Sequence, residues 1–222
     1  MKKLLTAAVV FAAVLVPSTA FAGTFTGTVV GKGGGSLAIA AKDGLVRTMR
    51  SRANLRLGAR VHVNGTAVRS FGVTHHARVR GVVVRRVAGT TFLAAGGSLL
   101  AMRAASAPAA GTVVNANVVI GAGQLTQQAV QAVGHDDRVT VQAPVTAVGP
   151  GTITVTVNGH PLTLRLPAGI QLPASLVGQS VTLTVKFEDE NEVEVENEDN
   201  DDGDHHGGDD GGHGGHDGGG DD

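Results

Sequence analysis

The chain has 222 residues, 42% of them hydrophobic, so it is long and apolar enough to bury a substantial core. It contains 33 Gly and six Phe but no Cys, Trp or Tyr. This composition excludes a disulfide-stapled scaffold, a cysteine-ligated zinc site and a thiol nucleophile. Because aromatic rings for base stacking are so few, we also expect no specific nucleic-acid partner.

Residues 1–22 have the pattern of a secretory signal peptide. Lys2 and Lys3 precede an apolar run over residues 4–16, and Ala20-Phe21-Ala22 provides a small-residue cleavage site. A membrane-spanning helix needs about 20 apolar residues, so this run is too short for a permanent anchor. We therefore expect a protein that is exported to the periplasm or the medium and has no transmembrane anchor after cleavage.

The net charge of −1 conceals two regions of opposite sign. Residues 23–186 carry sixteen Lys and Arg against three acids, a net charge of +13, whereas residues 187–222 carry sixteen acids and no Lys or Arg, a net charge of −16. Three large apolar residues cannot offset the ordering entropy of the acidic segment, so residues 188–222 are predicted to be a disordered tail. Glu and Val alternate over residues 192–196 as in a strand, but carboxylates on one face repel one another.

Alternation with a period of two residues predicts β-strands in the basic region. Two such runs, 152–157 and 160–166, flank Asn158-Gly159, which favours a two-residue type I′ turn. That turn sets Val155 opposite Leu162 and places the apolar side chains on one face of a hairpin.

Other short-range signals are less regular. A second hairpin is predicted at Asn64-Gly65, with Val61 opposite Val68. The Gly-rich stretch 31–36 has the composition of a phosphate-binding loop but not its spacing, so we interpret it as another hairpin turn. The apolar spacing over residues 125–133 predicts one short helix.

A Val-rich strand, a Gly turn, a hairpin and a further strand led by Gly recur three times along the basic region. We therefore predict an all-β fold of tandem small OB-like or SH3-like β-barrel modules with little helix, followed by the disordered acidic tail. The expected modules cover residues 23–77, residues 78–142 with a short helical insertion, and residues 143–187.

Three stretches of Gly, Val and Thr carry a resemblance to a known family. Residues 27–30, 151–157 and 178–185 resemble secreted bacterial repeat domains of uncharacterised function. The similarity covers roughly residues 24–187. It implies an OB-like β-barrel and transfers no catalytic or binding residue.

The His- and Asp-rich part of the tail is a candidate metal site. Imidazole and carboxylate donors on a Gly-rich backbone can wrap Zn²⁺, Ni²⁺ or Cu²⁺, and no other cofactor is indicated. The alternative is a solubilising segment without a specific ligand. The candidate ligands are Asp204, His205, His206, His213, His216 and Asp217.

The basic region is a candidate polyanion-binding surface. A positive field attracts acidic polymers of the cell envelope, and it would attract the chain's own acidic tail as well. Charge alone gives unspecific and salt-sensitive attachment, which is the alternative here. The candidate polyanion-binding residues are Arg47, Arg50, Arg52, Arg56, Arg60, Arg78, Arg80, Arg85 and Arg86.

No catalytic residues are predicted, because the basic region has only three acids and neither a Gly-x-Ser-x-Gly nor a His-Glu-x-x-His motif. The leading hypothesis is a secreted, non-enzymatic binding or structural module of the bacterial cell envelope. The alternative is an extracytoplasmic metal-binding or buffering protein that acts through its tail. The identity of the ligand and the oligomeric state are left open.

Overall fold

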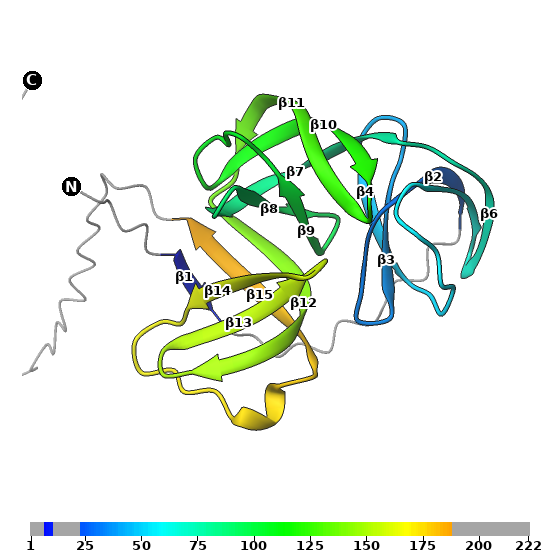
Figure 1. Ribbon diagram of the computed structural model, residues 1–222. Helices are drawn as coiled ribbons and strands as arrows, with labels where there is room; N and C mark the ends of the chain where they lie inside the picture. The colour runs from blue at the N-terminus through cyan, green and yellow to red at the C-terminus, as the bar shows by residue number, and fades with distance from the viewer. Residues whose placement is uncertain (1–6, 11–22, 188–222) are drawn as a thin grey trace, which may run out of the picture. The chain divides into compact units, whose positions relative to one another are not determined.

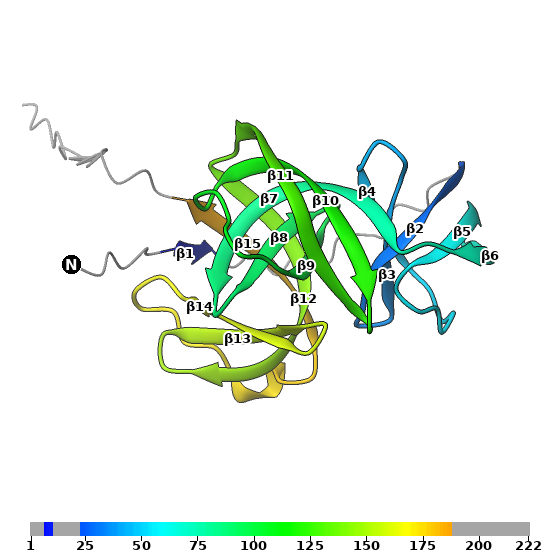
Figure 2. The same cartoon turned by 45° about the horizontal axis from the view of Figure 1, so that its top comes forward.

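The structure is a computed structural model that describes residues 7–10 and 23–187. This part of the chain forms fifteen β-strands, one 3-10 turn, η1 (Ala174–Leu176), and no α-helix (Figures 1 and 2). The predicted all-β class with little helix is therefore confirmed for the described residues. None of them forms a helix with the length and apolar character to cross a membrane.

The first strand group, β2 to β6, is an antiparallel sheet in the order β4-β3-β2-β5-β6. In β5, buried and exposed residues alternate, so that Val61 and Val63 face the core while Arg60 and His62 face outward. The strands are β2 (Thr24–Gly33), β3 (Ser36–Ala40), β4 (Val46–Arg50), β5 (Ala59–Asn64) and β6 (Ala67–Val73).

The second strand group, β7 to β11, closes on itself. Each strand pairs with the next in the ring β7-β8-β9-β11-β10, and β10 pairs back to β7. All these pairings are antiparallel except that of β9 with β11, which is parallel. The strands are β7 (His76–Val87), β8 (Thr90–Ala95), β9 (Ser98–Arg103), β10 (Thr112–Gly121) and β11 (Gln124–His135).

The third strand group contains β12, β13, β14 and β15, and β15 also pairs with a strand from the start of the chain. This strand, β1, is antiparallel to β15, and Figure 1 shows the two side by side. A single parallel pair, Gln142 with Ser98, joins β12 to β9 of the second group. The strands are β1 (Ala7–Val10), β12 (Arg138–Gly149), β13 (Thr152–Val157), β14 (His160–Arg165) and β15 (Ser180–Phe187).

One connectivity recurs in all three groups. The first strand of each group pairs with its second strand and with its fourth strand. It also carries a one-residue bulge opposite the second strand, at Val30 in β2, Val84 in β7 and Thr146 in β12. Because a bulge bends a strand and increases its twist, one long strand can serve both partners.

The groups run over residues 24–73, 76–135 and 138–187. The module boundaries predicted after residues 77 and 142 therefore fall inside β7 and β12. The connections between the groups are short, so each group starts almost where the preceding one ends.

Two apolar cores hold the groups together. The first core joins the first group to the interior of the second and includes Ile39, Val61 and Leu93. The second core joins the outer face of β7 to β9 to the third group and includes Phe92 and Leu162. All six residues of β8 are buried because the strand faces both cores. Burial of each large apolar side chain stabilises the fold by about 1.5–3 kcal/mol.

Two of the predicted hairpin turns are confirmed. Val155 lies opposite Leu162, and Asn158 and Gly159 have φ values of 49° and 81°, as a type I′ turn requires. The Gly-rich stretch 31–36 contains the turn between β2 and β3, which is Gly34-Gly35.

The hairpin predicted at Asn64-Gly65 forms with a different register. Its turn is Gly65-Thr66, so Val68 lies opposite Val63 instead of Val61. The shift makes Val63, instead of Val61, the direct cross-strand neighbour of Val68.

The helix predicted over residues 125–133 is wrong, because these residues belong to β11. A bulge leaves Gln128 without a partner on β10, since Val118 lies opposite Gln127 and Asn117 opposite Ala129. The extra residue changes the phase of the alternation, so that Leu125 and Val130 pack against the same core. Their separation of five residues does not fit the two-residue alternation of a regular strand, so the sequence pattern did not identify this strand.

Candidate functional site

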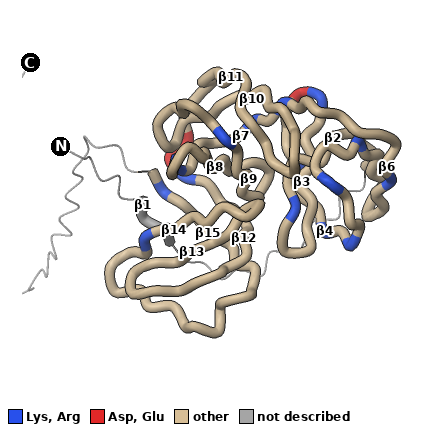
Figure 3. Tube along the Cα trace, viewed as in Figure 1, with Lys and Arg blue, Asp and Glu red and all other residues tan. Residues whose placement is uncertain are grey.

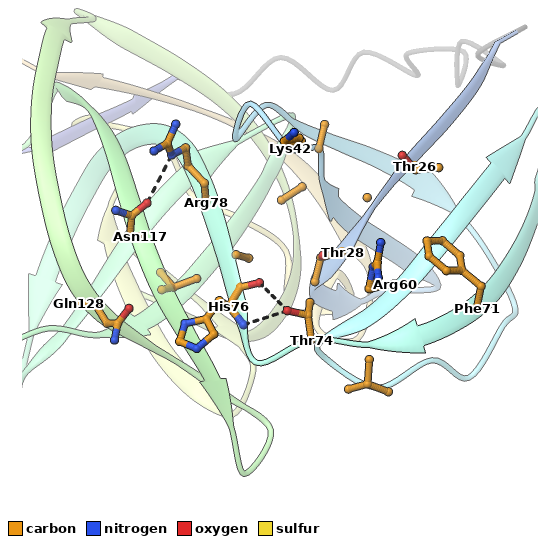
Figure 4. Close-up of a pocket in the computed structure, with 16 residues that line it drawn as sticks. Thr26, Thr28, Lys42, Arg60, Phe71, Thr74, His76, Arg78, Asn117 and Gln128 are labelled. Atoms are coloured by element: carbon orange, nitrogen blue, oxygen red, sulfur yellow. Dashed lines mark hydrogen bonds between the residues drawn. The ribbon is translucent and has the colours of Figure 1, made fainter.

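A cleft of about 660 Å³ lies between the first and second strand groups (Figure 4). Strands β2, β5 and β6 line one side, and strands β7, β10 and β11 line the other. Its walls are fixed by the shared first core and by bonds between the groups. The Arg80 amide donates to the Gly44 carbonyl at 2.7 Å, and the Thr48 and Ser98 hydroxyls lie 2.7 Å apart.

Three exposed cations from three different elements line the cleft. Lys42 lies in the β3–β4 loop, Arg60 on β5 and Arg78 on β7 (Figure 4). The Arg60 guanidinium lies 4.7 Å from the centre of the Phe71 ring, an arrangement that favours the cation electrostatically. Arg78 Nε donates to Asn117 Oδ1 at 3.3 Å, which orients the guanidinium while its terminal nitrogens remain available.

None of the three acids in the described part of the chain lines this cleft. The Asp43 carboxylate accepts a hydrogen bond from the Leu45 amide at 3.0 Å within its own loop. Asp136 and Asp137 lie in the β11–β12 connection, where Asp137 Oδ1 is 3.6 Å from His135 Nε2. Figure 3 shows how few acidic positions accompany the many Lys and Arg. The charge of the cleft is therefore not neutralised by its own lining.

Two lining side chains are placed by β-bulges. Phe71 is the extra residue of β6, between Ser70 opposite Val61 and Gly72 opposite Arg60. Gln128 is the extra residue of β11 described above. Bulges redirect side chains in this way at binding sites. Because each is an extra residue in a bulge, it lies outside the alternation of apolar and polar positions. The sequence analysis therefore did not identify Phe71 or Gln128 as candidate site residues.

Neutral polar groups complete the lining. Thr26 and Thr28 present hydroxyls from β2, and Asn117 and Gln128 present amides from the opposite side. Thr74 stabilises the start of β7, because its hydroxyl donates to the His76 carbonyl at 3.1 Å and accepts from the His76 amide at 3.2 Å. The cleft thus combines cations, hydroxyls, amides, the Phe71 ring and the His76 imidazole, a set suited to holding an anionic polar ligand.

The structure brings two of the nine predicted polyanion-binding arginines, Arg60 and Arg78, into this cleft. Arg47 is half-buried, with its guanidinium 4.7 Å from the centre of the Phe25 ring. Four more of the nine predicted arginines are exposed but do not line the cleft. They lie on β4, in the segment after β4 and on β7, and they are Arg50, Arg52, Arg56 and Arg80.

The remaining two arginines bind backbone carbonyls. Arg85 Nη1 donates to the Thr163 carbonyl at 2.9 Å, which ties β7 to β14. Arg86 Nη2 donates to the Ala105 carbonyl at 2.6 Å, which ties β7 to the segment after β9. Both therefore connect strands in addition to carrying charge.

Several predicted features lie outside the described residues: the signal peptide except residues 7–10, the tail 188–222, and with it the candidate metal ligands Asp204, His205, His206, His213, His216 and Asp217. Within the described ranges, no group of three or more His, Asp or Glu could hold a metal ion.

No protein-family model, curated protein or solved structure matches this chain. The resemblance to secreted repeat domains therefore stays a prediction.

Proposed function

We propose that this protein is an exported, non-enzymatic binding module of the bacterial cell envelope that holds an acidic polysaccharide in the cleft between its first and second strand groups. The observation that carries the proposal is that Lys42, Arg60 and Arg78 line the same cleft, and that this lining contains no acid in the described part of the chain. Guanidinium groups form strong charge-assisted hydrogen bonds with carboxylate and sulfate groups.

The strand connectivity supports an OB-like assignment for the groups. The ring of β7 to β11 has the order first, second, third, fifth and fourth strand, as a five-stranded Greek-key barrel would. The first group has the same order without a pairing between β4 and β6. Barrels of this kind bind oligosaccharides and oligonucleotides, an analogy that supports a ligand class and no more.

A sugar polymer suits the cleft better than a nucleic acid does. Proteins that bind single-stranded nucleic acids stack successive bases on several aromatic rings, whereas the described lining of this cleft has one phenyl ring, Phe71, and one imidazole, His76. One ring can cover one face of a sugar, and the Thr hydroxyls and the amides of Asn117 and Gln128 match sugar hydroxyl groups. The three cations would then bind the acidic substituents.

The test is the affinity of the processed protein, residues 23–222, for heparin-like and uronic-acid oligosaccharides, measured by calorimetry. Arg60→Ala and Arg78→Ala should each weaken binding about fivefold, since an exposed charge contact contributes about 1 kcal/mol. Arg103→Ala is the matched control, because Arg103 is exposed on β9 and does not line the cleft.

Equal losses in all three variants would reduce the interaction to unspecific charge attraction and would contradict the proposed site. Turnover of the oligosaccharide that one of these substitutions abolishes would contradict the non-enzymatic assignment. Metal buffering by the tail, the alternative function, depends on residues outside the described part and stays a prediction.

A further inference from the structure

The fourth strand of each group has a neighbour on its outer edge, but the source of that neighbour differs. In the first two groups it is the next strand of the chain, which follows after the two-residue turns Gly65-Thr66 and Ala122-Gly123. In the third group it is β1, with Ala7 opposite Phe187 and Val9 opposite Val185. Strand β1 therefore occupies the place that a fifth strand has in the other groups.

Removal of residues 1–22 on export would open this edge of β15. The Phe187 amide donates to the Asp137 carbonyl at 2.7 Å, on the β12 side. Because backbone groups alternate along an antiparallel strand, the amides of Thr184 and Lys186 point to the opposite side, which is the outer edge. Val185 is fully buried beside that edge. An uncovered edge of this kind is a template for pairing with another strand.

We propose that residues 192–196 replace β1 on the edge of β15 in the exported chain and complete the third group as its fifth strand. The segment begins five residues beyond Phe187, and Val193 and Val195 are the only large apolar residues that follow Phe187 in the sequence. When an odd number of residues connects β15 to this segment, Val193 and Val195 lie on the same face of the sheet as Val185 and Phe187, because side chains alternate between the two faces along paired strands.

The outer face of the third group supplies charges that favour this occupant. Lys186 lies directly opposite Arg138 on β12, and both side chains are exposed. Like charges in this position destabilise a sheet. Glu192, Glu194 and Glu196 would lie on the same outer face, next to Lys186. Their carboxylates would thus be attracted to the two cations, which offsets the repulsion among the glutamates.

This inference rests on the export that the proposed function includes, and it does not involve the cleft. It is tested by hydrogen exchange in the processed protein, residues 23–222. The Thr184 and Lys186 amides should be protected, and the double substitution Val193→Asp with Val195→Asp should speed their exchange at least about tenfold. The Val185 amide, which faces β12, should be unaffected. The matched control Gly207→Asp with Gly208→Asp adds the same two charges to the chain beyond residues 192–196 and should leave the protection in place.

Three results would overturn the proposal. The first is rapid exchange of Thr184 and Lys186 in the processed protein. The second is protection that survives the valine substitutions. The third is protection that increases with protein concentration, which would identify a second copy of the chain as the occupant.

Discussion

The packing of the first strand group against the second is tested by the substitution Gly96→Ala. Gly96 and Gly97 form the turn between β8 and β9, with φ values of 55° and 79°. A methyl group at Gly96 would collide with the Val46 carbonyl of the first group, whereas a methyl group at Gly97 would meet no atom within 4 Å. Gly97→Ala is therefore a matched control with the same backbone conformation.

Both substitutions place Ala in the left-handed region, which costs about 1–2 kcal/mol. Only Gly96→Ala adds the collision, and a backbone carbonyl cannot move aside as a side chain can, so the extra cost should be about 1–3 kcal/mol. Urea denaturation of the processed protein measures the difference as a lower midpoint at an unchanged slope.

Gly96→Ala should also weaken oligosaccharide binding under conditions in which both variants are folded, because Val46 begins the strand that follows the Lys42 loop. Equal stability of the two variants would refute the packing of β4 against the β8–β9 turn, and with it the fixed geometry of the cleft.

Three further predictions concern the core and the tail. Leu93→Ala should destabilise the processed protein by about 2–5 kcal/mol in urea denaturation, because Leu93 is fully buried in the core that the first two groups share; a loss below about 1 kcal/mol would contradict that packing. Truncation after Asn197 should strengthen binding to acidic oligosaccharides at low salt, because the acidic residues removed with 198–222 no longer compete. The gain should shrink at physiological ionic strength, where the Debye length is about 8 Å; unchanged affinity at low salt would rule out competition by the tail. The same truncation should abolish most uptake of Zn²⁺ and Cu²⁺ in a titration if the tail histidines are the ligands, and equal uptake would eliminate the metal-buffering hypothesis.

Local geometry explains which parts of the fold were predictable from the sequence. The hairpin at Asn158-Gly159 was predicted in its correct register because both turn residues adopt positive φ and the flanking alternation is unbroken. At Asn64-Gly65 the same dipeptide was misleading. There the chain turns one residue later, and Val63 pairs with Val68.

The cleft was not predictable, because it depends on bulges and on contacts between distant strands. A bulge displaces one residue from the alternation, so Phe71 and Gln128 carry no periodic signal that would place them at a site. The arginine-rich composition indicated a basic surface but could not show that Arg60 and Arg78 line one cleft while Arg85 and Arg86 bind backbone carbonyls. That division follows from how the strand groups pack.

The binding site is tested most directly by a crystal structure of the processed protein with an acidic oligosaccharide. Our account predicts carboxylate or sulfate groups within hydrogen-bonding distance of Arg60 and Arg78, and a sugar ring against Phe71. An oligosaccharide bound to Arg50, Arg52 and Arg56 instead, with the cleft empty, would contradict it.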